Sequence, residues 1–227
     1  MTITKRIVCL ANSRKLSGRC VAGRELIRGR PRAWIRPVSD RPNEAVSMCE
    51  RQYADSGDPR VLDIIDISLH EPRPKGHQQE NWLLDSDLYW AKVAQYPWSS
   101  MDQLVDKSDT LWCNGYSTRN GKNDRIPINL VATETGSLKL IYANSLQIKV
   151  FCYYNKRRVQ AQFRYADEDY EIWVTDPIIE QEYLMREDGN YRLRNIYLTI
   201  SLGEPNEDNF CYKLVAAVIR AQDARHG

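Results

Sequence analysis

The sequence lacks the segments and motifs that mark several large protein classes. None of its 227 residues belongs to an apolar run approaching the roughly 18 residues that cross a membrane. The N-terminal apolar run is short and is followed at once by basic residues, which argues against a signal peptide. G-x-S-x-G, P-loop and H-E-x-x-H motifs are missing as well. We therefore expect a cytoplasmic protein with no membrane partner, and a binding protein rather than an enzyme.

Patterns that bind metals are also scarce. The six cysteines are scattered without a C-x-x-C pair, and the chain has only three histidines. We expect free thiols packed as small hydrophobic groups, with no metal and no cofactor. A metal-dependent nuclease would need converging carboxylates, for which the candidates are Asp63, Asp66, Glu80 and Asp85. Asp63 and Asp66 are three residues apart on an expected strand, so their side chains point to opposite faces, which disfavours a nuclease.

Short strand-like segments dominate what is present. They are rich in β-branched or aromatic residues and are bounded by turn residues. They cover residues 5–10, 33–36, 61–69, 138–142, 146–154, 159–165, 170–175, 194–202 and 212–219. Helical signals are confined to residues 43–54, 99–105 and 178–185. The sequence predicts a mostly β protein with short connecting helices, in which the number of strands suits barrels or a sandwich.

A long loop divides the chain. Residues 113–136 contain three glycines and several asparagines and show no sustained period. We place the boundary inside it, between an N-terminal β domain at residues 1–125 and a C-terminal β domain at residues 126–227. No internal repeat is evident, although two small barrels can share a fold without sharing sequence.

Charge is segregated behind a formal net charge of only +2. Residues 1–60 carry thirteen Lys and Arg against six acids, whereas residues 165–188 carry nine acids against one Arg. Residues 139–164 carry six basic residues and no acid, and Asn155–Arg158 is predicted to be a basic hairpin tip. The candidate nucleic-acid-binding residues are Lys149, Lys156, Arg157, Arg158 and Arg164. The alternative is that blocks of opposite charge simply pair with each other.

Aromatic residues lie among these basic residues. Trp34 stands in RPRAWIRP, and strand alternation puts Phe151 and Tyr153 on one face with Lys149, as a stacking surface for bases requires. The alternative is that these rings belong to the core.

A second candidate site surrounds His77. The segment HQQENWLLD offers a titratable base, a carboxylate, an amide and an indole, a set of groups that suits a polar, planar ligand. The candidate ligand-binding residues are Arg36, His77, Glu80, Asn81 and Arg125. The alternative is a structural role, in which Trp82 plugs one end of a barrel and His77 satisfies buried backbone groups.

An ordered series of fragments carries a family resemblance. RIVCLANSRKLSGRCVAG, WIRPVSDRP, LDIIDISL, HQQENWLLD, WCNGYSTRNGKNDRIP, WVTDP, LTISLGEP and CYKLVAAVI follow one another along essentially the whole chain. Together they resemble the bacterial dual OB-containing domain family. The resemblance implies two tandem OB-like barrels and recognition of nucleic acid or a nucleotide-like ligand, in a bacterial defence or nucleic-acid-processing context. It implies no catalytic residues.

Several functions stay open from the sequence. Nucleic-acid binding is favoured, and the alternatives are a sensor of a small ligand or modified nucleotide, a protein-interaction adaptor in a multi-protein system, and an enzyme. The strand pattern fits the first because OB barrels commonly bind single strands or oligosaccharides.

Overall fold

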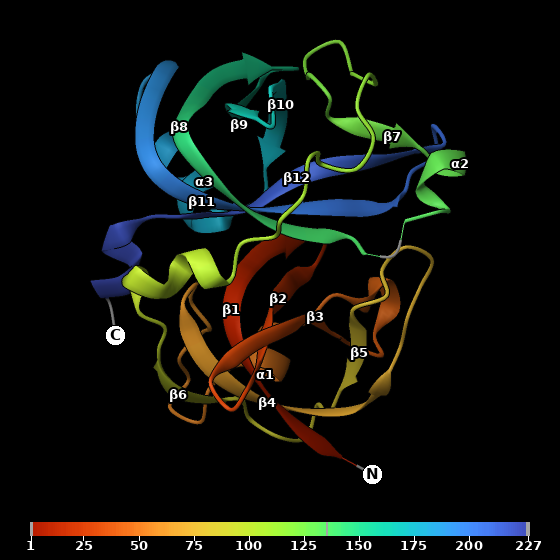
Figure 1. The fold of residues 1–227 in the computed structure, drawn as a ribbon, viewed down its shortest axis with the longest axis vertical. Helices are drawn as coiled ribbons and strands as arrows, with labels where there is room; N and C mark the ends of the chain where they lie inside the picture. Colours follow the sequence, from red (N-terminus) through yellow and green to blue (C-terminus); the bar gives the residue numbers. More distant parts are fainter. Residues whose placement is uncertain (1, 135, 226–227) are drawn as a thin grey trace. The chain divides into compact units, whose positions relative to one another are not determined.

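The computed structural model describes residues 2–134 and 136–225. The chain divides into two compact units, the first made of residues 1–104 and 221–227 and the second of residues 105–220. Each unit contains its own barrel and its own hydrophobic core (Figure 1). The mostly β fold with few and short helices is as expected.

Strands with alternating burial build the first unit. Along β4 (Asp63–Pro72), the buried Ile65, Ile67 and Leu69 alternate with less buried residues, as on a strand with one face on a core. The other elements of this unit are β1 (Ile3–Lys15), β2 (Gly18–Ile27), β3 (Arg30–Val38), η1 (Pro42–Glu44), α1 (Met48–Arg51), β5 (Asn81–Leu84), β6 (Ala91–Gln95), η2 (Trp98–Gln103) and η3 (Ala221–Arg225).

The first barrel has the strand order β1-β2-β3-β5-β4 and closes because β4 also pairs with β1. β3 and β5 are parallel, with Arg36 opposite Asn81, and the other barrel pairs are antiparallel. β6 extends the sheet beyond β4.

The second barrel repeats this plan. Its order is β8-β9-β10-β12-β11, closed by β11 against β8, and β10 and β12 are parallel at Trp173–Leu214 and Val174–Val215. The elements of this unit are β7 (Arg125–Pro127), α2 (Ile128–Val131), β8 (Leu138–Tyr153), β9 (Lys156–Tyr165), β10 (Glu168–Val174), α3 (Pro177–Leu184), β11 (Gly189–Pro205) and β12 (Phe210–Ile219). Both barrels are therefore five-stranded and OB-like, as predicted.

The two units divide after Leu104, earlier in the chain than the predicted boundary at residue 125. Residues 105–124 bond to the second barrel: Leu140 N donates to Asp106 Oδ2 at 2.8 Å, and Lys213 Nζ donates to the Cys113 carbonyl at 2.8 Å. Composition indicates a loop at residues 113–136, but it does not show which barrel the loop's hydrogen bonds serve.

Of the predicted helices, the one at residues 43–54 is shorter in the structure and the one at residues 178–185 is present. The expected helix at 43–54 is reduced to η1 and the single turn of α1, because Asn43 and Glu44 take positive φ angles of 66° and 56°. α3 matches the expected segment, with Asp176 Oδ1 accepting from Ile178 N at 3.0 Å as its N-cap. None of the described helices has the length and apolar character needed to cross a membrane.

Candidate nucleic-acid interface

The segment around His77 folds inward instead of forming an open loop. Arg36 Nη2 lies 3.0 Å from Glu80 Oε1, and the two side chains are only 3% and 5% exposed. Asn81 is fully buried and donates to Gln78 Oε1 at 3.3 Å, while His77 is 5% exposed. The structure thus brings Arg36, Glu80 and Asn81 together in a buried polar network that fastens β5 and its preceding loop to β3.

Trp82 and Arg125 have other surroundings. Trp82 packs against the first barrel's core with Lys5 Nζ 4.4 Å from its ring centroid, and Lys5 pairs with Glu25 at 2.7 Å. Arg125 belongs to the second unit, on β7, where its guanidinium carbon lies 4.1 Å from the ring centroid of Phe210.

The candidate metal-binding carboxylates are each bonded to a different side chain. Among the residues that the structure describes, no three His, Cys, Asp or Glu side chains converge on one point. The bonds are Asp63 with Tyr53 (2.8 Å) and Lys92 (3.0 Å), Asp66 with Arg6 (2.7 Å), Glu80 with Arg36 (3.0 Å) and Asp85 with Thr2 (2.8 Å).

The β8–β9 hairpin turns at Tyr154 and Asn155, before the basic run. Both residues have positive φ, 47° and 57°, as in a type I′ two-residue turn. Lys156 pairs with Tyr153, so the basic residues begin β9. The prediction of a basic tip is wrong, because the pairing of Tyr153 with Lys156 leaves only Tyr154 and Asn155 for the turn.

Arg157 has a structural role. Its Nε donates to Asp188 Oδ1 at 2.8 Å and its Nη1 to the Leu184 carbonyl at 2.6 Å, while its Nη2 donates to the Arg186 carbonyl. These acceptors lie at and just beyond the C-terminal end of α3, where carbonyl groups lack helical partners. Arg157 therefore fastens α3 to β9.

The other four predicted nucleic-acid-binding residues differ in availability. Arg164 is paired with Asp167 at 3.3 Å and approaches Asp169 at 4.0 Å. Lys149 Nζ lies 4.9 Å from the ring centroid of Phe151. Lys156 and Arg158 make no ion pair with any residue that the structure describes. Lys149, Lys156 and Arg158 are thus the members of the set that remain available to an anionic ligand.

Four aromatic rings gather on the outer face of the second barrel, and we call this group the aromatic platform: Phe151, Tyr153, Tyr154 and Trp173. The rings of Phe151 and Trp173 stack with centroids 5.8 Å apart and planes 22° apart. Tyr153 lies 5.6 Å from Trp173 and 4.5 Å from Tyr154. The neighbours of Trp173 on β10, Ile172 and Val174, point into the core, so Trp173 points outward.

Phe151 and Tyr153 lie on β8, Tyr154 lies in the β8–β9 turn and Trp173 lies on β10, so the platform flanks the strands and the loop with which OB barrels bind their ligands. β9 and β10 are the second and third strands of this barrel, and the β8–β9 turn is the loop between its first and second strands. OB folds bind oligonucleotides and oligosaccharides on the face of strands two and three and on adjoining loops. The sequence-predicted grouping of Lys149, Phe151 and Tyr153 on one face is confirmed by their contacts.

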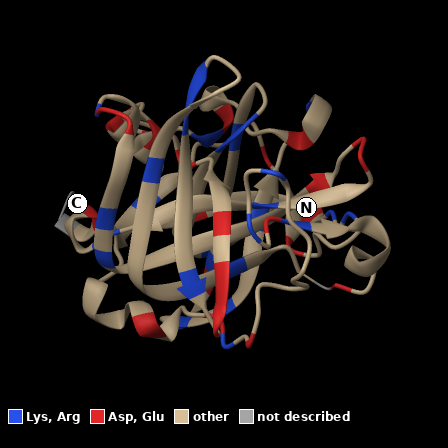
Figure 2. Cartoon of the chain, turned by 90° about the horizontal axis from the view of Figure 1, so that it is seen from above, with Lys and Arg blue, Asp and Glu red and all other residues tan. Residues whose placement is uncertain are grey.

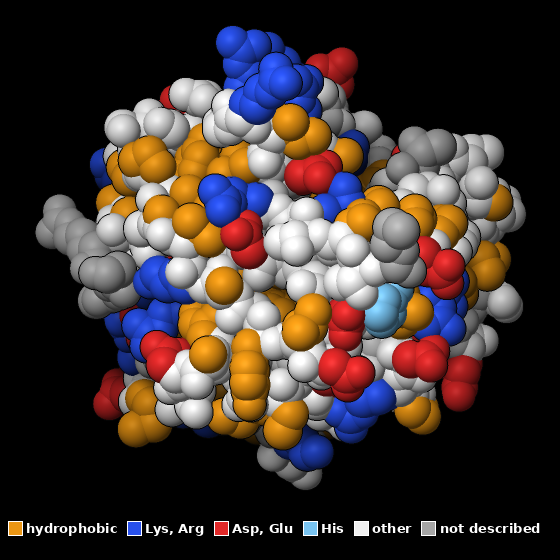
Figure 3. All heavy atoms as spheres, turned by 90° about the horizontal axis from the view of Figure 1, so that it is seen from below, with side chains coloured by type: hydrophobic (Ala, Val, Ile, Leu, Met, Phe, Trp, Pro, Cys, Tyr) orange, Lys and Arg blue, Asp and Glu red, His pale blue; other side chains and the backbone are white. Residues whose placement is uncertain are grey.

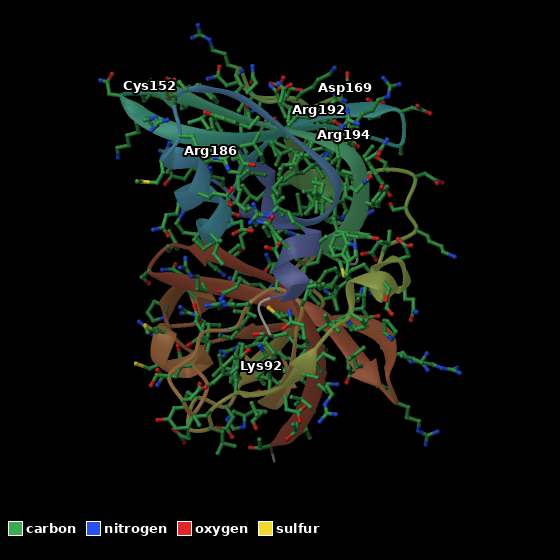
Figure 4. All side chains as sticks on the ribbon, turned by 90° about the vertical axis from the view of Figure 1, so that its left-hand side faces the viewer. Lys92, Cys152, Asp169, Arg186, Arg192 and Arg194 are labelled. Carbon is green, nitrogen blue, oxygen red and sulfur yellow. The ribbon has the colours of Figure 1, made fainter. Side chains whose placement is uncertain are left out.

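A hollow of about 320 Å³ adjoins the platform. Its lining residues are Arg119, Asn120, Cys152, Tyr153 and Tyr154. Figure 4 shows Cys152 at one end of the second barrel, well away from Arg192 and Arg194. Because Tyr153 belongs to both, the hollow continues the platform.

A buried lysine fixes the base of the loop that carries Arg119 and Asn120. Lys213 Nζ donates to the Cys113 carbonyl at 2.8 Å and to Asn114 Oδ1 at 3.1 Å. Burial lowers the pKa of Lys213 to about 7. The protonation state of Lys213 therefore changes near neutral pH, at the start of the loop.

The corresponding face of the first barrel is strongly basic. Arg24 lies 4.8 Å from the ring centroid of Trp34 and donates to the Arg32 carbonyl at 3.0 Å. Arg28, Arg30 and Arg32 are exposed and make no ion pair with any described residue. For the chain as a whole, Figure 2 shows Lys and Arg spread over several strands rather than collected in one block.

Two residues of this interface escaped the sequence reasoning. Trp173 stands in the strand YEIWVT, where its outward direction follows from alternation once Ile172 and Val174 are known to be core. Arg119 lies in an irregular loop, and no local signal brings it close to the β8–β9 turn.

A comparison with protein families gives one match. The family model described as the dual OB-containing domain matches residues 5–218. Neither the curated proteins nor the solved structures give a match to this chain.

Proposed function

Because the chain belongs to the dual OB-containing domain family, we propose that it is a binding module whose ligand is single-stranded nucleic acid. The observation that carries the proposal is the aromatic platform, whose rings come from the first and third strands of the second barrel and from the turn between its first and second strands. The proposal assigns binding to the chain and no catalytic step.

Stacking explains why the ligand is a single strand. A base has to leave its own stack before an aromatic side chain can cover its face, and each such contact contributes about 1–3 kcal/mol. Phe151, Tyr153 and Trp173 offer neighbouring rings, while Lys149 and Arg158 lie beside them on β8 and β9. Rings that bind bases and cations that follow phosphates are the two parts of a sequence-tolerant interface.

The first barrel supports the same ligand class. Residues 14–36 contain eight Lys and Arg and one acid, Glu25, which is paired with Lys5. Arg24 and Trp34 form a cation–π pair on β2 and β3, the second and third strands of that barrel. An excess of exposed guanidinium groups favours a polyanion.

The test is a fluorescence anisotropy titration of a labelled single-stranded oligonucleotide. Trp173→Ala should weaken binding by about 1–3 kcal/mol, the value of one stacked base. The control is Tyr142→Ala, which removes an exposed aromatic side chain of β8 that lies outside the platform. Equal affinity for wild type and Trp173→Ala would refute the proposal.

Protein binding is the second candidate, favoured by the first unit's β6. This strand pairs with β4 along one edge and has no ladder partner along the other among the described residues. Val93 on β6 is 45% exposed and Tyr89, just before the strand, is 61% exposed. Figure 3 shows apolar side chains reaching the surface in small groups. Sheet edges of this kind accept an added strand. If β6 has this role, a proline at Val93 should abolish association with a partner and leave oligonucleotide binding intact.

A further inference from the structure

The hollow beside the aromatic platform has the size and lining of a nucleotide site. Its volume is about 320 Å³, at the lower end of the range of small-ligand pockets. Two phenol rings, a guanidinium, a carboxamide and a thiol line it. Neither Arg119 nor Asn120 uses its side chain in a bond to any described residue, so a cation and an amide remain available to a ligand.

The loop that carries Arg119 and Asn120 is firmly anchored. The fully buried Gln160 donates from Nε2 to the Asn120 carbonyl, and Lys122 exchanges two backbone hydrogen bonds with Glu171 at 3.0 and 3.2 Å. A Cβ on Gly121 would lie 1.9 Å from Asp124 Oδ2, so only glycine fits there. Anchored side chains lose little freedom on binding, which favours affinity.

Tyr154 is an unexpected residue for its position. It occupies the first position of a type I′ turn, where Asn or Gly is favoured, and its side chain is 83% exposed. A bulky residue with positive φ is strained, and an exposed ring gains little from burial. The turn therefore presents an aromatic ring where folding alone would favour a smaller residue.

We propose that this hollow binds one nucleotide unit, with the base against Tyr153 and Tyr154 and the phosphate on Arg119. The inference rests on the proposed function, because Tyr153 joins the hollow to the platform and a strand lying on the platform enters the hollow next. Asn120 supplies an amide that can pair with a base edge, as amides do in single-strand recognition. A phosphate accepts charge-assisted hydrogen bonds from a guanidinium.

Cys152 provides a direct readout. Its exposed thiol lines the hollow, so a ligand there should slow its alkylation by N-ethylmaleimide, measured by peptide mass spectrometry. Cys49, exposed in the first unit, is the internal control. The probes are 5′-AMP, adenosine and inorganic phosphate. We expect 5′-AMP to protect Cys152 at concentrations about tenfold below adenosine, as one charge-assisted hydrogen bond implies, and to leave Cys49 unaffected.

Variants locate the effect. Arg119→Gln should bring the 5′-AMP concentration for protection up to that of adenosine. Tyr154→Gly should weaken protection by both probes while the melting temperature stays within about 4 °C, because relief of the positive-φ strain offsets the lost ring contact. Arg194→Gln, an exposed arginine on β11 far from Cys152, should behave as wild type (Figure 4).

The outcomes separate this site from the proposed function. Equal alkylation rates with and without 5′-AMP, or protection that persists in both Arg119→Gln and Tyr154→Gly, would overturn the site. Oligonucleotide binding that depends on Trp173 but leaves Cys152 unprotected would overturn the site alone. Protection by 5′-AMP without any oligonucleotide binding would support the site and contradict the proposed function.

Discussion

Glu80→Gln should strongly destabilise the first barrel. The substitution keeps the shape of the side chain but removes the carboxylate that lies 3.0 Å from Arg36 Nη2. The Arg36 side chain is 3% exposed, so water cannot reach it to solvate the charge that is left behind. Leaving one partner of a buried pair uncompensated typically costs about 3–5 kcal/mol. Since whole domains are stable by about 5–15 kcal/mol, much of the first unit's stability would be lost.

Removing both charges of the Arg36–Glu80 pair should cost much less stability than removing one of them. Arg36→Met combined with Glu80→Leu removes both charges at once, and such replacements are often neutral or stabilising. The assay is urea denaturation, with hydrogen exchange of β3 and β5 peptides to assign the transition to the first unit. A loss below about 1 kcal/mol for Glu80→Gln, or a double variant no more stable than Glu80→Gln, would refute a buried pair. A loss below about 1 kcal/mol for Glu80→Gln would also make Glu80 a candidate ligand-binding residue again.

Three further predictions follow from individual contacts. Arg157→Gln should destabilise the second unit by about 1–3 kcal/mol, measured by thermal melting, because it removes the hydrogen bonds to Asp188 and to the Leu184 carbonyl at the end of α3. Lys156→Gln combined with Arg158→Gln should instead weaken oligonucleotide binding, measured by anisotropy, with little change in stability. The stability of the second unit should rise between about pH 7 and pH 10. In that window the unfolded chain keeps the proton that Lys213 has lost in the folded protein, because the folded pKa of Lys213, about 7, lies below the unfolded value. Denaturation of Lys213→Met at several pH values should show a flatter pH profile. In the folded protein, Cys49 and Cys152 should react with a thiol reagent before Cys9 and Cys211, because the thiols of Cys9 and Cys211 are buried and burial raises the pKa of Cys211 to about 11. After unfolding, the reagent should detect six free thiols.

Local patterns predicted the barrels and part of the interface. Alternation along residues 146–154 was enough to put Lys149, Phe151 and Tyr153 on one face, because a strand with one face on the core fixes the direction of every side chain. The segment at His77 was harder, since its polar residues look like a ligand loop until β5 is paired with β3. The sequence predicts that Arg157 binds nucleic acid, because its acceptors around α3 are 27 to 31 residues away and no local pattern shows its structural role. Interactions of that span depend on the closed barrel and leave no local signal.

The salt dependence of single-strand binding tests the central claim most directly. Affinities of a single-stranded oligonucleotide and of its duplex would be measured from low to moderate salt for wild type, Trp173→Ala and Arg28→Gln/Arg30→Gln/Arg32→Gln. We expect preference for the single strand, an affinity loss of about 1–3 kcal/mol with unchanged salt slope for Trp173→Ala, and a shallower slope, by about 0.7 per lost phosphate contact, for the triple variant. Equal affinity for duplex and single strand, or a Trp173→Ala variant that binds as tightly as wild type, would contradict the account.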